Sequence, residues 1–235
     1  AEAQGSFFTF DGSRWSLQQT LPAAVGLDSI GCATPTFCLA VTRTSRTPVA
    51  FDGTQWTQQS PIPGVTAELT SISCAAPDWC GVGDAHGRVA VLDATGWGTW
   101  HHGPNVGAHV QCPVPQFCLA VVGSLSLIDS AGVWSTVGTG TSQSRGLSCA
   151  SATMCAMAGP NKSIQVFHGT SRRHVAAHEP LDAVEAMACV PASWCVEVED
   201  EGGAQEWDGT RWADSPSQAT SRKPRYSWLP MMRWL

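Results

Sequence analysis

Apolar residues recur along this chain with the spacing of β-strands, and they do so around cysteines. Such alternation predicts strands with one buried face. In five places an apolar residue lies two positions before a cysteine: Ile30, Ile72, Val110, Leu147 and Met187. A second cysteine follows each of these cysteines, and small or branched residues such as Leu39, Ala40 and Val41 come after it. That composition favours a second strand, which we expect to pack tightly near the centre of the molecule.

The cysteines form five pairs, each with five residues between the partners. The pairs are Cys32 and Cys38, Cys74 and Cys80, Cys112 and Cys118, Cys149 and Cys155, and Cys189 and Cys195. The first cysteines of successive pairs are 42, 38, 37 and 40 residues apart. A fixed period near 40 residues indicates a repeat protein in which each repeat is one small group of strands.

Each cysteine pair is predicted to form a local disulfide bond. Two strands joined by a short turn bring the flanking cysteines opposite one another, at about 5.5 Å between their Cα atoms. Zinc is the alternative, but zinc-binding cysteines are usually separated by about two to four residues, and five identical sites would be unusual. By chain entropy each bond contributes at most about 2.4 kcal/mol before strain is subtracted. Disulfides in this number predict a secreted or extracellular protein.

A second turn recurs between the cysteine pairs, and it consists of Asp and Gly followed by Trp. Asp-Gly after an apolar run is a strong hairpin signal, because Gly accepts positive φ and the Asp side chain caps the turn. The Trp is expected to cover the contact between neighbouring repeats, with a sugar-stacking surface as the alternative. The clear copies are 10–15, 51–56, 92–97 and 207–212, whereas 128–134 reads as one residue longer and 167–170 is degenerate.

A unit of four strands, two at the disulfide and two at the Asp-Gly turn, is the blade of a β-propeller. The chain holds six hairpins of this second kind, including the longer and the degenerate copy, but only five cysteine hairpins. We therefore predict an all-β fold, a β-propeller of four-stranded antiparallel blades, with six blades of which one is incomplete. Five blades is the alternative. Residues 1–216 are expected to form the single propeller domain with five cystine repeats, and 217–235 an atypical tail.

The tail at 217–235 differs from the repeats in composition, because it lacks cysteine and is basic and aromatic. It can be a degenerate hairpin that closes the ring, an anchor for a membrane or partner, or an artefact of truncation or addition. Pro224 and Pro230 argue against the amphipathic helix of a membrane anchor. The first and the third interpretation stay open.

Composition and charge exclude several classes of protein. Of the 235 residues 43% are hydrophobic, which supplies enough apolar surface for a folded core. The sequence holds no continuous run of 18 apolar residues, so we expect no membrane span. The net charge is −6. Without the four cations of the tail, 9 basic residues stand against 19 acidic ones, a balance that disfavours nucleic acid as a partner.

The pattern Ser-x-Cys-Ala-x-x-x-Phe/Trp-Cys-x-Ala-Val-Gly, followed by Asp-Gly-x-x-Trp, resembles the secreted β-propeller repeats of high-GC Gram-positive bacteria. Residues 73–83 match it clearly, and 112–123 and 148–159 match it well. The resemblance covers nearly all of 8–215, and such repeats are similar to those of the dispase autolysis-inducing protein and of extracellular sensor domains. It implies binding, often of proteins, without catalysis. A looser resemblance to the Asp-boxes of sialidases, whose loop is one residue longer, implies no glycosidase chemistry.

In a propeller the turns of the cysteine and Asp-Gly hairpins share one face, and the remaining connections lie on the other. The turns are alike in every repeat, which suggests a scaffold, whereas the connections differ. Binding specificity normally resides in variable loops on a rigid frame. We therefore expect the binding residues on the face of the variable connections, with these candidates: His86, Arg88, His101, His102 and Lys162.

Signals of catalysis are absent from the sequence motifs. The chain has no nucleophile elbow, no phosphate-binding glycine loop and no His-Glu-x-x-His, so we predict no enzyme, no catalytic or metal-binding residue and no cofactor. The acidic run from Glu197 to Glu201 is interpreted as a solvated loop, with Ca²⁺ binding as the alternative. The predicted function is a secreted, monomeric binding module for an unidentified protein or other macromolecule. A glycan-binding or glycoside-processing propeller and a purely structural module are the alternatives.

Overall fold

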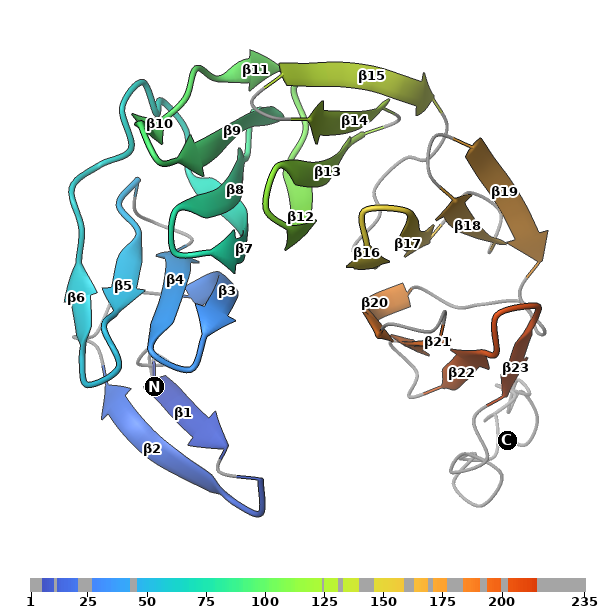
Figure 1. The fold of residues 1–235 in the computed structure, drawn as a ribbon, viewed down its shortest axis with the longest axis horizontal. Helices are drawn as coiled ribbons and strands as arrows, with labels where there is room; N and C mark the ends of the chain where they lie inside the picture. The colour runs from blue at the N-terminus through green and yellow to red at the C-terminus, as the bar shows by residue number, and fades with distance from the viewer. Residues whose placement is uncertain are drawn as a thin grey trace, which may run out of the picture.

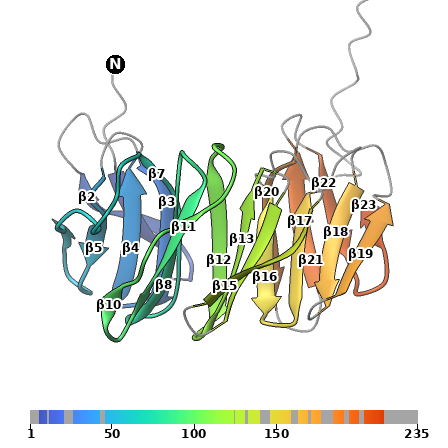
Figure 2. The ribbon, with the colours of Figure 1, turned by 90° about the horizontal axis from the view of Figure 1, so that it is seen from above.

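The structure is a computed structural model, which describes the following residues: 6–10, 12–20, 27–42, 46–123, 125–130, 133–139, 146–158, 163–168, 171–176, 184–190, 194–199 and 203–214. These residues form strands and turns, and no helix is found among them. The strands are grouped in blades around a central axis (Figure 1). Seen from the side, the strands run along that axis (Figure 2).

Five antiparallel sheets form the complete blades, with strands in chain order from the axis outwards (Figure 1). Blade 1 holds β3 (Leu27–Thr34), β4 (Phe37–Thr42), β5 (Val49–Phe51) and β6 (Trp56–Gln58); blade 2 holds β7 (Leu69–Ala76), β8 (Trp79–Asp84), β9 (Arg88–Asp93) and β10 (Gly96–Trp97), with β11 (His101–His102) also paired to β9. Blade 3 holds β12 (Ala108–Val114), β13 (Phe117–Val122), β14 (Leu125–Ser130) and β15 (Val133–Thr139). Blade 4 holds β16 (Leu147–Ser151), β17 (Met154–Ala158), β18 (Ser163–His168) and β19 (Ser171–Ala176); blade 5 holds β20 (Val184–Val190), β21 (Trp194–Glu199), β22 (Ala204–Trp207) and β23 (Trp212–Asp214).

The sixth blade is represented by one hairpin, β1 (Ser6–Phe10) and β2 (Trp15–Thr20). Its register places Phe10 opposite Trp15, as Phe51 stands opposite Trp56 in blade 1. The hairpin therefore corresponds to the two outer strands of a blade. The all-β propeller with six blades, one of them incomplete, is confirmed, and the tail at 217–235 lies outside the described residues.

The innermost strand of each blade is the first one, not the second. β3, β7, β12, β16 and β20 line the axis in Figure 1. The second strand lies between neighbouring blades, and in β8 every residue is buried. The second strand is next to the innermost one, in agreement with the prediction that it packs tightly near the centre. Its residues are small or branched because another blade covers them.

All five predicted disulfides are formed, and each lies in the seam between two blades. Their Cα atoms are 3.9–4.1 Å apart, closer than expected from the sequence. Leu39 and Val41 of blade 1 pack in one core with Cys74 and Cys80 of blade 2. Gly81 lies so close to the next disulfide that a Cβ there would be 2.6 Å from the sulfur of Cys112. The disulfides thus contribute apolar volume between blades as well as a covalent link.

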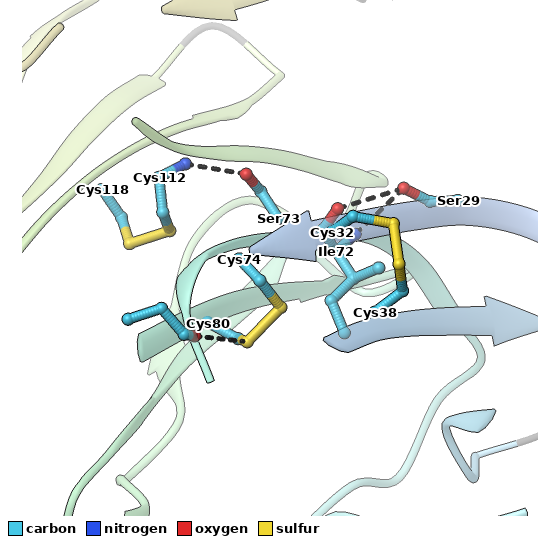
Figure 3. Close-up of a disulfide and its surroundings, with 10 residues drawn as sticks. Ser29, Cys32, Cys38, Ile72, Ser73, Cys74, Cys80, Cys112 and Cys118 are labelled. Carbon is cyan, nitrogen blue, oxygen red and sulfur yellow. Dashed lines mark hydrogen bonds between the residues drawn. A yellow bond between two sulfur atoms is a disulfide. The ribbon is translucent and has the colours of Figure 1, made fainter. Parts of the chain in front are cut away.

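Serines join the innermost strands of neighbouring blades. The Oγ of Ser29 accepts a hydrogen bond from the backbone N–H of Ile72 at 3.1 Å, and Ser71 receives one from Val110 at 3.0 Å. Ser73 and Ser148 bind the N–H groups of Cys112 and Cys189 in the same way (Figure 3 shows the first). The free edge of an innermost strand carries backbone N–H and C=O groups that need hydrogen-bond partners. The serine of one blade supplies a partner for an N–H group on the innermost strand of the next blade.

The Asp-Gly turns have the expected side-chain cap. Asp52 Oδ1 accepts hydrogen bonds from the Thr54 hydroxyl at 2.7 Å and from the N–H groups of Thr54 and Gln55. These bonds, above all that of the Thr54 hydroxyl, lower the pKa of Asp52 to about 2. Gly53 has φ of 96°, which explains the glycine at this position. Asp208 is held alike by Thr210 and Arg211, and its pKa is also lowered to about 2.

Two acidic residues are placed differently from the sequence interpretation. Asp129 stands opposite Trp134, as Phe51 stands opposite Trp56, so this turn has the ordinary length and Asp129 occupies the aromatic position. It is fully buried. Glu197 is also fully buried, in the middle of β21, and not in a solvated loop. The prediction failed because charged residues are rarely buried, and what surrounds these two side chains depends on strands that are distant in the sequence.

Candidate functional site

The two faces of the propeller carry different turns, as predicted. In blade 1 the first turn and the third turn lie side by side: a Cβ placed on Gly53 of the third turn would be 3.0 Å from the Cβ of Thr36 in the first turn. We call this side the cystine face. The other side, the variable face, carries the connections from second to third strands and from blade to blade. Above blade 2, three of these connections meet in what we call the loop cluster: 61–68, 84–88 and 98–107.

An ion pair organises the centre of the loop cluster. Arg88 Nε donates to Asp84 Oδ2 at 2.7 Å, and Arg88 Nη2 contacts the same oxygen at 2.5 Å. Asp84 Oδ1 accepts from the backbone N–H groups of His86 and Arg88. Both charged side chains are buried. Because a buried charge is costly without a partner, each holds the other in place and fixes the turn between β8 and β9.

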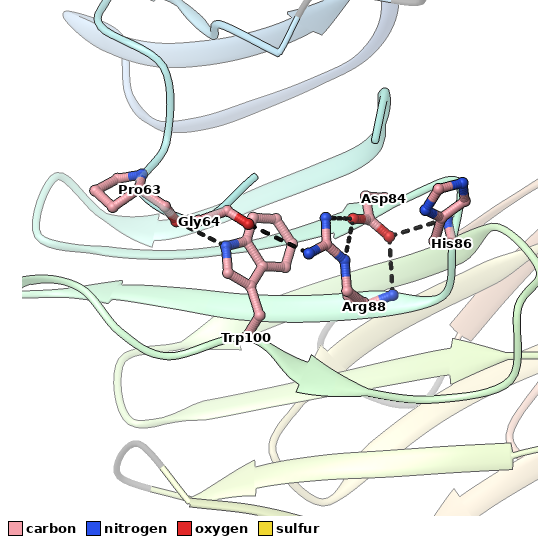
Figure 4. Close-up of polar contacts among 6 residues, drawn as sticks. All are labelled: Pro63, Gly64, Asp84, His86, Arg88 and Trp100. Atoms are coloured by element: carbon pink, nitrogen blue, oxygen red, sulfur yellow. Dashed lines mark hydrogen bonds and ion pairs between the residues drawn. The ribbon is translucent and has the colours of Figure 1, made fainter. Parts of the chain in front are cut away.

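Trp100 ties the blade-to-blade connections to this ion pair (Figure 4). The Arg88 guanidinium lies 4.8 Å from the centre of the Trp100 ring, a cation–π contact. Arg88 Nη1 donates a hydrogen bond to the backbone carbonyl of Gly64 at 3.2 Å. The Trp100 indole N–H donates one to the backbone carbonyl of Pro63 at 2.8 Å. Residues from all three connections thus share one network.

Close backbone packing fixes the remaining part of the loop cluster. Gly87 has φ of 75°, and a Cβ on it would overlap the carbonyl of Pro104 at 1.8 Å. The N–H of Gly103 donates to the carbonyl of Gly87 at 3.0 Å. Only glycine fits at position 87, and the connection 103–107 is pressed against the turn before β9. The loop cluster is therefore preorganised by its own contacts.

The structure brings four of the five predicted binding residues together in the loop cluster. His86 and His102 are exposed, and His101 is half-buried. His101 and His102 form β11, where they stand opposite Val89 and Arg88. Arg88 is buried by Asp84 and Trp100, which gives it a positioning role. Lys162 lies outside the described residues.

Sequence reasoning missed Asp84 and Trp100. The charges of Asp84 and Arg88 flank a turn with glycine, and this spacing was a usable signal of a cap. Trp100 gave none, because its contacts come from Pro63 and Arg88, which are distant in sequence.

A pocket of about 350 Å³ lies on the opposite side, on the cystine face. It is open and lies where turns of blades 2 and 3 meet. Its lining residues are Asp78, Trp79, Asp93, Ala94, Thr95, Pro115 and Gln116. Asp93 is engaged in its own turn by the Thr95 hydroxyl, which lowers its pKa. Because the turns that line this pocket recur from repeat to repeat, we interpret it as part of the structural scaffold and not as a binding site.

In the described part of the chain no three His, Cys, Asp or Glu side chains gather in a way that could hold a metal ion. None of the described segments is a helix that could cross a membrane.

Comparisons with known proteins agree with this architecture. No protein-family model matches the chain, and no curated protein matches it either. Among solved structures it is similar to one of YCF48 bound to D1 peptide, with 10% identity and a TM-score of 0.61 over 83% of this chain and 69% of that one. It is also similar to the WD40 β-propeller domain of Doa1, with 11% identity and a TM-score of 0.67 over 84% and 69% of the two chains. A chain of the mitotic checkpoint complex gives 12% identity and a TM-score of 0.72 over 90% and 73%. At such identities the likeness shows the fold: this chain is a β-propeller similar to WD40 propellers.

Proposed function

We propose that this protein is a secreted, non-enzymatic binding module that recognises a protein partner through the loop cluster on its variable face. The observation that carries the proposal is the display of exposed side chains on a fixed frame. His86, His102 and Val106 are exposed above a buried ion pair and a cation–π contact. A surface that is ordered before binding loses less entropy when a partner docks.

Two further observations support parts of this proposal. The structure of YCF48 bound to D1 peptide shows that a propeller similar in fold binds a peptide. The five disulfides favour an oxidising compartment, and hence secretion.

The test is selection of peptides from a displayed library on the intact protein, followed by affinity measurement on variants. His86→Ala, His102→Ala and Val106→Asp should each weaken the selected peptide about tenfold, which corresponds to about 1.4 kcal/mol. Gln55→Ala and Val114→Asp are the controls, since both residues are exposed at turns of the cystine face.

If all five variants bound the selected peptide with the same affinity as the natural chain, the loop cluster would be excluded as the binding surface. A glycan array run in parallel addresses the alternative function. Binding of a glycan together with failure to select any peptide would contradict a protein partner.

A further inference from the structure

The disulfide of each blade faces the blade that precedes it in the chain. Cys74 and Cys80 of blade 2 share a core with Leu39 and Val41 of blade 1. Cys195 of blade 5 packs in the same way against blade 4. The preceding blade therefore covers each disulfide, and the access of solvent to a disulfide depends on how complete that blade is.

Blade 1 differs from the others, because the blade before it is represented among the described residues by the hairpin β1–β2 alone. This hairpin corresponds to outer strands, and its Phe7 covers Cys38 in one core with Phe51 and Trp56. The inner part of the seam between blades 5 and 1, which we call the incomplete seam, is less covered. Cys32 lies there on the innermost strand β3, and it is exposed.

Exposure separates Cys32 from the other nine cysteines. The second cysteine of every pair is buried, with an exposed fraction between 0% and 7%. Among the first cysteines, Cys74 and Cys112 are buried as well. Cys149 and Cys189 are half-buried, so Cys32 is the one exposed cysteine of the ten. An external molecule can therefore reach one of the five disulfides through its first cysteine.

The wall of blade 5 leaves this approach open. At the positions from which serines of blades 1, 2 and 4 bind the next innermost strand, blade 5 has Ala186 and Ala188. Both alanines are exposed, and Val198 of the same blade is 41% exposed. A methyl group offers no hydrogen bond to a strand edge. Within the described residues, blade 5 thus does not cover Cys32.

Access decides which of these disulfides reacts with a thiol. Exchange begins when a thiolate attacks one sulfur atom, and its rate depends on access to that sulfur and on the thiol that leaves. If the first cysteine is attacked, the leaving group in all five pairs is the buried second cysteine. The pairs then differ in access to the first cysteine. Exposed disulfides are typical of labile, regulatory or catalytic sites.

We propose that the Cys32–Cys38 disulfide is a site of reversible exchange with an external dithiol reductant, whereas the other four disulfides are structural. A thiolate of the reductant forms a bond to Cys32 Sγ, the Cys32–Cys38 bond breaks, and Cys38 Sγ leaves with the electron pair and takes up a proton. The second thiolate of the reductant attacks the reductant's own sulfur in the mixed disulfide and releases Cys32 as a thiolate. Two electrons pass to the protein, and the reductant becomes a disulfide.

Blade 1 keeps other contacts when this disulfide is open. Ser29 Oγ on β3 accepts a hydrogen bond from the N–H of Ile72 at 3.1 Å and donates one to its carbonyl at 3.3 Å (Figure 3). Leu39 and Val41 on β4 belong to the core shared with blade 2. Both strands thus stay attached to blade 2. We expect the change to be confined to the first turn of blade 1 and to the hairpin β1–β2 that covers it.

Timed reduction of the full chain tests the proposal. The folded protein is treated with dithiothreitol at about pH 8, where thiolate forms, and the free thiols are alkylated after an acid quench. Trypsin then places each pair on a peptide of its own: 15–43, 47–88, 89–145, 146–162 and 174–211. The Cys32–Cys38 pair should open at least about tenfold faster than any other pair. The internal control is Cys74–Cys80, the equivalent pair in the next blade.

A monothiol identifies the sulfur that is attacked. N-acetylcysteine lacks the second thiol that would release it, so it remains in the mixed disulfide. Cys32 should carry N-acetylcysteine, and Cys38 should be alkylated. Fragmentation of peptide 15–43 distinguishes the two positions. Attachment at Cys38, earlier opening of another pair, or equal rates for all five pairs would overturn the proposal.

Two measurements separate direct attack from unfolding. The far-UV circular dichroism of the chain should not change when the first pair opens, and loss of this signal in step with reduction would overturn the proposal. In the variant Cys32→Ser with Cys38→Ser, the other four pairs should open at the rates of the natural chain. Faster opening there would make this pair structural too and overturn its assignment. The incomplete seam lies apart from the loop cluster, so these outcomes are independent of the proposed function.

Discussion

The seam between blades 1 and 2 and the seam beyond blade 5 use the same repeat positions with opposite results. In the first, Val41 and Ile72 are buried against each other beside the Cys74–Cys80 disulfide. In the second, Val198 and Ile30 are exposed. The side chains hardly differ, so burial in this protein is a property of the neighbouring blade. A repeat position therefore acquires its energetic meaning only when the next repeat is in place.

The largest expected effect comes from placing a charge at one repeat position in both seams. Val41→Asp should lower the free energy of unfolding by about 4 kcal/mol, because the carboxylate would be buried without a partner. Val198→Asp should cost about 1 kcal/mol or less, because water reaches this position. Guanidinium unfolding with the disulfides intact measures both. Equal losses would show that the two seams are alike.

The second prediction concerns the ion pair in the loop cluster, which lies over the closed part of the ring. Arg88→Met should reduce stability by about 3 kcal/mol, because Asp84 would remain buried and charged. The double variant Asp84→Leu with Arg88→Met should recover to within about 1 kcal/mol of the natural chain. A double-mutant cycle by urea unfolding measures the coupling. Additive losses would mean that the two residues act separately.

The third prediction removes a serine link between innermost strands. Ser71→Ala deletes its bonds to the N–H and the carbonyl of Val110 and should cost about 1 to 2 kcal/mol. Ala186→Ser, at the equivalent position of blade 5, should change stability by no more than about 0.5 kcal/mol. Amide hydrogen exchange at Val110 provides a local readout. Unchanged protection there after Ser71→Ala would contradict the assigned role.

The smallest effect is expected from the capped turns, which are alike in blade 1 and in blade 5 beside the incomplete seam. The pKa values of Asp52 and Asp208 are lowered in the folded chain to about 2. A carboxyl group whose pKa is lower in the folded than in the unfolded state stabilises the fold at pH values above its unfolded pKa, near 3.9. This stabilisation is lost as the pH falls through the folded-state pKa of about 2. The natural chain should therefore lose more stability than Asp52→Ala with Asp208→Ala between about pH 4 and 2. Unfolding midpoints across this range test it, and parallel curves would refute it.

The fold was predictable from sequence because its signals are local and repeated. Cysteine spacing reported the disulfides, and Asp52 with Gly53 reported the turn, since each depends on residues a few positions apart. Asp129 was misplaced because alignment by residue type assigned it to the turn, whereas strand register set it opposite Trp134. The buried state of Arg88 was not predictable, because Trp100 and Gly64 reach it from different connections. Of the candidate site, the sequence indicated which connections differ between repeats, but not the contacts that hold these connections together.

The alanines at 186 and 188 have a consequence for how molecules of this protein meet. An open-ended row of repeats presents, at its last member, the means of attaching another member, and head-to-tail growth into filaments follows when that attachment is strong. Blade 5 has methyl groups at the two positions where blades 1, 2 and 4 have serine hydroxyls that bind the edge of the next strand, and where blade 3 has His109 and Gln111. The edge amides of a foreign blade added there would lack the serine partners that the edges of blades 2, 3 and 5 have. The two methyl groups thus work against polymerisation through the exposed side of blade 5.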